Sequence, residues 1–377
     1  VKTSTKAELA RYHHQSLCSP PKVTLLKAIS NNHLTSIPGL TYDLISKHLP
    51  ASTATDKGHM RRARQGVRST RNNTKEIQQA RADVENMHPK EEICSAHDMY
   101  CFAALADANT GTMYTDLTGH FPARSYKNMA YIFVAYVYDL NIIIARAMPS
   151  RDDDAMTDAF EHVITYLDER GCKPKLNVMD NECSKTVESY IRKQQIDIQL
   201  VPPHNHRVNA AERAIATFKE HFISALATVD INCPRQLWDE FLEQVQDTLN
   251  LLRASRRTPS ISAYQDLEGK FDYNKTPLAP LGTKALVYDD PDTRASWAPH
   301  GTDSYNVGRA KKHYRCLRFF VPSTRRFRIS DSYRLYPTHC QIPEIAQVDQ
   351  TLTAATDLLD AHRATLPKPT QAKLRHI

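Results

Sequence analysis

Apolar residues in the middle of the chain first form short runs that are typical of β-strands. One strand begins near Cys101 and precedes a turn at Thr118-Gly119. Two further runs, residues 131–138 and 141–147, are rich in Ile, Val and Tyr and are separated only by Asp139-Leu140. β-branched and aromatic residues favour strands, so the pattern predicts a three-stranded antiparallel meander.

The pattern then changes to that of an amphipathic helix over residues 152–171, which opens with acidic residues and ends at glycine. Its apolar positions are Met156, Phe160, Val163, Ile164 and Leu167. Beyond it, strands at 175–179 and 196–201 alternate with helices at 184–193 and 209–226, and another helix covers 234–252. Three strands followed by helix, strand, helix, strand and helix is the element order of the ribonuclease-H-like fold. We therefore predict an α/β core over residues 101–256, with a mixed five-stranded sheet and flanking helices.

The segments on either side of this core differ from it in composition. Residues 1–50 predict a small helical module broken by prolines, and residues 51–100 form a polar, basic linker poor in large apolar side chains. Residues 257–280 are a proline-containing linker, and residues 281–340 predict a small β-barrel-like domain with strands at 284–288, 317–321 and 328–336. Residues 341–377 are a helical or disordered tail with one helical stretch at 346–365.

The net charge of +7 is concentrated in two segments. Between Lys57 and Arg81 eight basic residues face only Glu76, and between Arg309 and Arg334 nine basic residues face only Asp331. Charge of one sign attracts polyanions without selecting among them, so each segment is either a nucleic-acid contact or a solvated face. The aromatic residues near the second segment are expected in the core of the β domain rather than stacked on bases: Trp297, Tyr305, Tyr314 and Phe319.

Cysteine usage and hydropathy exclude two other classes of protein. The eight cysteines form no CxxC pair and follow no secretory leader, which favours a reducing intracellular setting. The longest apolar run, residues 131–138, is far shorter than the roughly 20 residues that a membrane helix needs. We expect a soluble protein with no membrane partner.

Three acidic residues occupy positions that this fold brings together. Asp116 lies in the first strand, Asp180 at the end of the fourth, and Glu212 in the first turn of the helix at 209–226. Adjacent strand ends and a helix start can converge on one point, where like charges repel unless cations lie between them. Two Mg²⁺ or Mn²⁺ ions there would serve phosphoryl transfer. Taken singly, each residue also fits a capping or turn role.

The sequence around these residues resembles the integrase of copia-type LTR retrotransposon polyproteins and, more distantly, retroviral integrases. The resemblance runs from about His14 to about Pro337. Its strongest blocks are Tyr114-Thr-Asp-Leu-Thr-Gly-His-Phe-Pro, Met179-Asp-Asn-Glu-Cys-Ser and Gln199-Leu-Val-Pro-Pro-His-Asn-His-Arg-Val-Asn-Ala-Ala-Glu-Arg-Ala. It implies a catalytic, metal-binding Asp, Asp, Glu triad, and those blocks place the triad on Asp116, Asp180 and Glu212.

The resemblance also implies an activity and its partners. The enzyme would trim the ends of a linear element DNA and join their 3′ hydroxyls to chromosomal DNA in the nucleus, with a cytoplasmic intermediate allowed. It would act as a homo-oligomer. Residues expected to contact DNA are Arg213, Lys219, Arg309, Lys311, Lys312 and Arg315. Lys219 lies about two turns after Glu212, on the same helix face. His204 and His206 are either auxiliary groups that orient phosphates or water, or loop residues bonded to the backbone.

The chain departs from the family pattern at three places. The interval between Asp180 and Glu212 is shorter than usual, and Glu182 replaces the glycine that commonly follows the second Asp-Asn. In the amino-terminal module, His14 and Cys18 resemble the first pair of a zinc site, but no CxxC follows. Tetrahedral zinc needs four such donors, so we expect no zinc.

Two other functions remain open at this level. One is a catalytically inactive, element-derived DNA-binding protein that keeps the fold and the charge. The other is a nuclease on the same scaffold, because the metal chemistry is shared and the fold alone does not separate the two. The intact triad favours catalysis, and the block from Pro202 to Arg213 favours an integrase.

Overall fold

A five-stranded mixed sheet in the order β3-β2-β1-β4-β5 organises the middle of the chain. The computed structural model describes residues 3–60, 110–180, 184–201 and 210–337. Strands β1 (Thr112–Leu117), β2 (Tyr131–Val137) and β3 (Ile142–Met148) pair antiparallel, and β4 (Leu176–Asp180) and β5 (Asp197–Val201) extend the sheet in parallel with β1. The predicted mixed sheet is confirmed.

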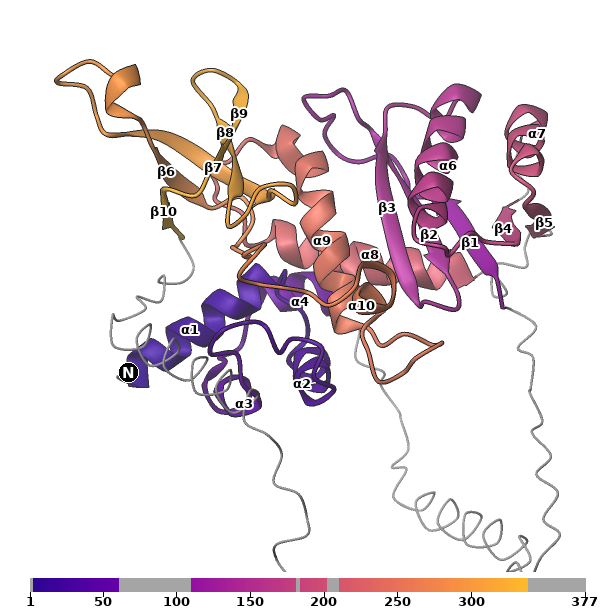
Figure 1. Ribbon diagram of the computed structural model, residues 1–377, viewed down its shortest axis with the longest axis horizontal. Helices are drawn as coiled ribbons and strands as arrows, with labels where there is room; N and C mark the ends of the chain where they lie inside the picture. Colours follow the sequence, from indigo (N-terminus) through magenta and orange to yellow (C-terminus); the bar gives the residue numbers. More distant parts are fainter. Residues whose placement is uncertain (1–2, 61–109, 181–183, 202–209, 338–377) are drawn as a thin grey trace, which may run out of the picture.

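Helices cover both faces of this sheet (Figure 1). On one face, α6 (Asp153–Asp168) and α7 (Lys185–Lys193) share an apolar cluster with Phe133 and Val137 of β2. On the other face, α8 (Ala210–Leu226) and α9 (Trp238–Leu252) share a cluster with Val134 and Tyr136 of the same strand. Because both faces of β2 are covered, its apolar run is continuous rather than alternating.

Capping residues fix where the two helices of the first face begin. The Asp152 carboxylate accepts a hydrogen bond of 2.9 Å from the Ala155 N–H at the start of α6. The Ser184 hydroxyl accepts one of 3.2 Å from the Val187 N–H at the start of α7. Each cap satisfies an amide that the helix itself leaves without a partner.

The amino-terminal segment folds into four helices with an apolar core of their own. These are α1 (Thr3–Ser16), α2 (Lys22–Ser30), α3 (Tyr42–His48) and α4 (Thr53–His59). Leu25, Leu34 and Ile45 of this core pack in one cluster with Leu251 and Leu252 at the end of α9. The module is therefore joined to the central fold by apolar contacts.

The predicted basic linker at 51–100 is wrong for its first residues, because α4 is a helix that packs on α8. Ser52 caps α4 by accepting a hydrogen bond from the Thr55 N–H. At Gly58, a Cβ would overlap the Glu220 carbonyl oxygen and the Ser224 hydroxyl of α8. Glycine allows this close approach, which composition alone did not reveal. Residues 61–100 lie outside the described residues.

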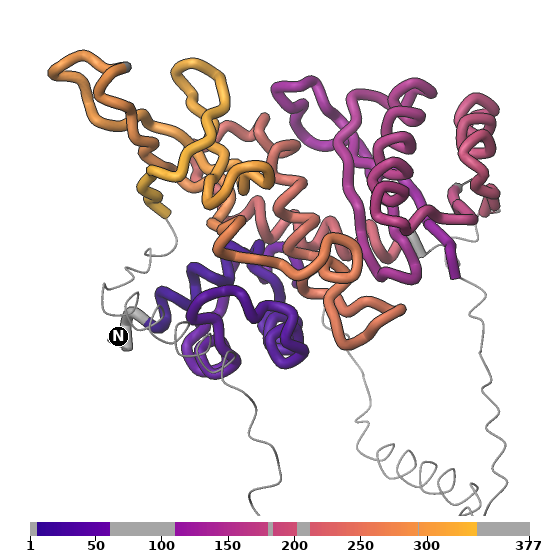
Figure 2. Tube along the Cα trace, in the orientation of Figure 1, coloured from indigo at the N-terminus to yellow at the C-terminus, as the bar shows by residue number. Residues whose placement is uncertain are grey.

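The predicted linker at 257–280 is also an ordered part of the fold. It contains α10 (Ala263–Glu268), and Ala263 and Leu267 belong to the apolar cluster under α6. The next residues run beside the amino-terminal helices (Figure 2), where the Tyr273 N–H donates a hydrogen bond of 3.3 Å to the Ser36 hydroxyl. This proline-containing stretch is therefore a connection that packs against the rest of the protein.

The carboxyl-terminal part is a second, fully antiparallel sheet in the order β10-β6-β7-β8-β9. Its strands are β6 (Lys284–Tyr288), β7 (Gly301–Arg309), β8 (Leu317–Val321), β9 (Arg326–Ser330) and β10 (Tyr333–Tyr336). Strand β7 was not predicted, and the single strand expected at 328–336 is divided between β9 and β10. The tail expected at 341–377 lies outside the described residues.

Two of the four aromatic residues expected in the core of this domain lie at the surface instead. Phe319 is fully buried and Tyr305 is partly buried against the central core. Trp297 is 98% exposed and Tyr314 is 67% exposed. Both lie in connections between strands, where no second layer covers them.

Helix α9 lies between the central sheet, the amino-terminal module and the carboxyl-terminal sheet (Figure 1). Its polar side chains reach all three. The Asn250 amide bonds to the backbone of Ile143 in β3, Gln244 donates to the Ser16 carbonyl at the end of α1, and Asp247 pairs with Arg309 of β7. The helix was predicted from its periodicity, but these three polar contacts were not.

In the parts of the chain that the structure describes, no helix is both long and apolar enough to cross a membrane.

Candidate active site

The parallel pairing of β1 with β4 places two of the three predicted carboxylates at neighbouring positions. Partners along the ladder run from Thr112 beside Leu176 to Thr115 beside Met179. Asp116 and Asp180 are the next residues on their strands. Side chains alternate between the faces of a sheet, so Asp116 lies on the face of Tyr114, which packs in the α8 cluster.

Asp116 is partly buried and its orientation is fixed locally. Its Oδ1 atom accepts a hydrogen bond of 2.6 Å from the Leu117 N–H. The residue opposite it on β2 is Val134, which is fully buried. The carboxylate therefore emerges from the sheet beside an apolar core, with one oxygen bonded to its own strand.

A buried polar contact holds β1 and β4 in register directly beside these positions. The Thr115 hydroxyl donates a hydrogen bond of 3.1 Å to the Asn177 side-chain oxygen, and both residues are almost completely buried. The Asn177 amide nitrogen has no hydrogen-bond partner among the residues that the structure describes. A polar residue with an unsatisfied group is costly in a core, so its placement points to a positioning role. Sequence reasoning missed Asn177, because one asparagine in a strand gives no distinctive pattern.

Glu212 lies in the first turn of α8 and is exposed. Two residues later, Ala214 and then Ile215 enter the apolar cluster that also contains Tyr114 of β1 and Val178 of β4. The first turns of α8 thus lie on the sheet face to which Asp116 belongs. Lys219 follows Glu212 by seven residues and is also exposed, as the predicted common helix face requires.

The structure brings the backbone of the site together but describes only part of its side chains. Asp180 ends β4, and its side chain lies outside the described residues, as do Glu182, His204 and His206. Among the side chains that are described, no three from His, Cys, Asp and Glu gather to hold a metal ion. Carboxylate oxygens on neighbouring strand ends are nevertheless the donors that Mg²⁺ and Mn²⁺ prefer.

The histidine and cysteine that resemble a zinc pair are bonded to the protein itself. The His14 Nε2 atom lies 2.8 Å from the Pro20 carbonyl oxygen, and the Thr248 hydroxyl donates to the Cys18 sulfur at 3.4 Å. Burial, opposed by the bond from Thr248, raises the pKa of the Cys18 thiol to about 12. Cys18 is therefore a protonated thiol that joins α9 to the end of the first helix.

The prediction that Arg309 contacts DNA is wrong, because its charge is paired inside the fold. Arg309 has a side chain that is 1% exposed and is ion-paired with Asp247 of α9. Lys311 pairs with the same carboxylate at 3.1 Å and with Glu243 at 3.2 Å. The Arg309 cation is therefore not available to a phosphate backbone, whereas the Lys311 side chain stays 35% exposed beside its two carboxylate partners.

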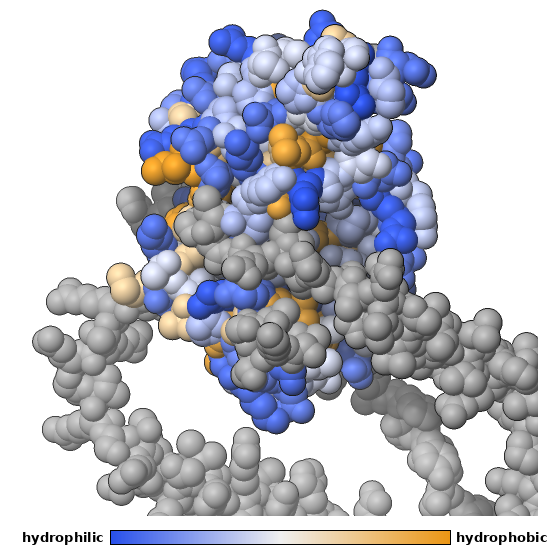
Figure 3. All heavy atoms as spheres, turned by 90° about the vertical axis from the view of Figure 1, so that its left-hand side faces the viewer, coloured by the Kyte–Doolittle hydropathy of each residue, from blue (hydrophilic) through white to orange (hydrophobic). Residues whose placement is uncertain are grey.

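The other predicted DNA contacts lie at the surface. Arg213 and Lys219 are exposed on α8, and Lys312 and Arg315 are exposed in the connection between β7 and β8. The side of the molecule that carries β6, β10 and α1 is largely hydrophilic, with small, separate apolar patches (Figure 3). Surface cations of this kind attract phosphates without reading a base sequence.

Comparisons with known proteins give no family assignment. No protein-family model matches the chain, and no curated protein does. Among solved structures, the catalytic core domain of BIV integrase matches with a TM-score of 0.32 and 15% identity, over 42% of this chain and 93% of that one. A simian T-cell lymphotropic virus intasome in complex with PP2A regulatory subunit B56 gamma matches with the same TM-score and identity, over 62% of this chain and 81% of that one. The fold assignment therefore rests on the sheet order and strand directions of this chain.

Proposed function

We propose that this chain is a metal-dependent DNA strand transferase of the integrase kind, with Asp116, Asp180 and Glu212 as its catalytic carboxylates. The observation that carries the proposal is the parallel register of β1 and β4, which gives Asp116 and Asp180 neighbouring positions at one edge of the sheet. The sequence blocks around all three residues, which resemble copia-type integrases, support the same assignment.

The donor set fits two Mg²⁺ or Mn²⁺ ions, because it offers carboxylate oxygens and no sulfur. Asp116, Asp180 and Glu212 would hold them. When bound, such ions activate an attacking hydroxyl or water and neutralise the charge that develops on the leaving oxygen.

The protein itself would position the DNA and the carboxylates. The Thr115–Asn177 contact keeps the two strands in register, and the Leu117 N–H orients Asp116. Arg213 and Lys219, exposed on the helix that carries Glu212, would bind phosphates near the reacting end. Because such contacts carry no base information, preference for a target sequence would be weak.

The wider setting follows from this substrate. Joining two ends of one linear DNA needs at least two active sites, so we propose a homo-oligomer. A chromosomal target places the reaction in the nucleus. The resemblance of the three sequence blocks makes a copia-type LTR retrotransposon the proposed source of the DNA that is joined.

A strand-transfer assay tests the proposal directly. The purified chain is incubated with a labelled duplex oligonucleotide and supercoiled plasmid in Mg²⁺ or Mn²⁺, and joined products are quantified. We expect joining that requires the metal and that falls by about a thousandfold or more in Asp180→Asn, as expected when one member of a catalytic group is removed.

Asp197→Asn is the matched control, because Asp197 is an exposed aspartate on β5, opposite Leu176 at the other end of β4. It should join DNA as the unchanged chain does. If neither the unchanged chain nor its variants join DNA but all bind it in a salt-sensitive way, the chain is an inactive, element-derived DNA-binding protein. Metal-dependent cleavage without joining would indicate a nuclease.

A further inference from the structure

A pocket of about 250 Å³ lies where the amino-terminal module meets the end of α8. Three separate parts of the chain form it: the last turns of α1, the stretch from Leu49 through α4, and Ala227 with Thr228 after α8. Thr228 lies 16 residues beyond Glu212, which corresponds to about 24 Å along a helix. The pocket is therefore far from the proposed catalytic carboxylates.

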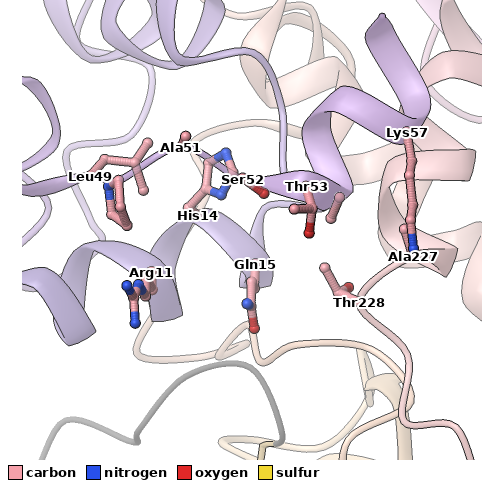
Figure 4. Close-up of a pocket in the computed structure, with 12 residues that line it drawn as sticks. Arg11, His14, Gln15, Leu49, Ala51, Ser52, Thr53, Lys57, Ala227 and Thr228 are labelled. Atoms are coloured by element: carbon pink, nitrogen blue, oxygen red, sulfur yellow. The ribbon is translucent and has the colours of Figure 1, made fainter.

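The charged side chains that line this pocket are all basic. Figure 4 shows Arg11 of α1 and Lys57 of α4 at opposite ends, with Gln15 and Thr53 between them. No aspartate or glutamate belongs to the lining. Arg11 has an ion pair with Glu8 at 2.9 Å, yet its side chain stays 42% exposed and retains further donors.

The rest of the lining is mixed, because Leu49, Pro50, Ala51, Ala54 and Ala227 are apolar and other residues supply hydrogen-bonding groups. Ser52 and Thr53 carry hydroxyls, and Gln15 carries an amide. His14 is 3% exposed and lies at the wall, where burial, opposed by a bond to the Pro20 carbonyl, lowers its pKa to about 4. Its neutral ring adds no charge at neutral pH, and its Nε2 atom is already bonded to the Pro20 carbonyl.

The volume limits the size of a ligand. Pockets for drug-sized molecules measure about 300–1,000 Å³, and one water takes about 30 Å³ of liquid. This pocket is below the first range and is equivalent to roughly eight waters. It has room for one phosphate or two linked phosphate groups, but not for an enclosed nucleotide.

We propose that this pocket is a phosphate-binding site for two linked phosphates, with Arg11 at one end and Lys57 at the other. The phosphate comes either from a free anion such as pyrophosphate or from the backbone of a nucleic acid. The second source rests on the proposed function, because it makes the amino-terminal module part of the DNA-binding surface.

Calorimetric titration of the full chain with pyrophosphate, at constant ionic strength, tests the site itself. We expect saturable binding that weakens about tenfold in Arg11→Gln and in Lys57→Gln, as the loss of one charge-assisted hydrogen bond predicts. Lys27→Gln is the control, because it removes the same charge from an exposed position on α2 outside the pocket. It should bind as the unchanged chain does.

Binding of a labelled DNA duplex at several salt concentrations shows whether the phosphate belongs to DNA or to a free anion. If the site holds DNA phosphates, Lys57→Gln lowers the dependence of log affinity on log salt by about one, and Lys27→Gln does not. If the ligand is a free anion, the duplex affinity is the same in both variants, while pyrophosphate binding is weakened only in Lys57→Gln. Absence of saturable pyrophosphate binding, or equal binding by all variants, overturns the site. Pyrophosphate binding without strand transfer would overturn only the proposed function.

Discussion

A few buried charged residues attach the carboxyl-terminal sheet to helix α9. Asp247 is buried, and its carboxylate pairs with Arg309 of β7 and, at 3.1 Å, with Lys311. Burial raises the pKa of Asp247, but the two cations outweigh it and hold that pKa below its ordinary value. Arg309 also lies 5.6 Å from the centre of the Tyr264 ring, which adds a favourable contact to its charge.

Removing the carboxylate charge should leave Arg309 buried without compensation. We expect Asp247→Asn to lower the free energy of unfolding by about 3–5 kcal/mol, the range measured when one partner of a buried ion pair is removed. Urea unfolding followed by circular dichroism measures this. Glu243→Gln is the control, since Glu243 is 48% exposed and, among the described residues, its ion pair is with Lys311. A loss for Asp247→Asn no larger than for Glu243→Gln would show that the pair does not hold the sheet.

At the scale of elements, the close approach of α4 to α8 makes a helix of a segment whose composition predicted a linker. Helix α4 has only seven residues, and it is stable because it packs on α8 through Gly58. The same helix supplies Lys57 to the pocket. Its docking on α8 therefore determines the geometry of the proposed phosphate site.

Gly58→Ala separates packing from helix propensity. Alanine is the better helix former by about 1 kcal/mol, so propensity alone predicts stabilisation. We expect the opposite, a loss of about 1–3 kcal/mol from overpacking, because the new methyl group meets the backbone of α8. The denaturation midpoint of Gly58→Ala should fall, whereas that of Gly119→Ala, where the methyl group meets open space, should change little. A rise for Gly58→Ala would refute the tight contact.

At the scale of the whole molecule, buried histidines couple stability to pH. His13 and His14 of α1 are almost completely buried, and burial, opposed by a bond to a backbone carbonyl, lowers the pKa of each to about 4. Burial, followed by the nearby His59 and His14, lowers the pKa of His221 on α8 to about 3. All three lie in the amino-terminal module or the helix on which it packs.

These pKa values determine whether the stability of the folded chain rises or falls with pH. The unfolded chain takes up protons below about pH 6.5, whereas the folded chain does not until about pH 4, so stability is complete above pH 6.5 and is lost as pH falls. Three such groups give a loss of about 4 kcal/mol per pH unit between pH 6 and 4. Chemical denaturation at pH 7, 6 and 5 measures it. The slope should become shallower in His221→Gln and should be unchanged in His313→Gln, a change at an exposed histidine of the carboxyl-terminal part. Equal slopes in both would contradict this origin.

The sequence by itself determined the central sheet and the strands on which Asp116 and Asp180 lie. Periodicity marked β2, β3, α6 and α8, because amphipathic and apolar runs are local properties of the chain. The order of these elements, together with the blocks around Asp116, Asp180 and Glu212, was enough to expect strand ends and a helix start at one edge.

Only the tertiary structure decided which polar residues are buried and which segments pack. Arg309 reads as a surface cation in a basic run, and Asp247 reads as the polar side of an amphipathic helix, yet each is buried by the other. Trp297 reads as core and is exposed. Burial depends on elements distant in the sequence, which no local pattern contains. The same reason hid the pocket, whose three walls come from parts of the chain that meet only after folding.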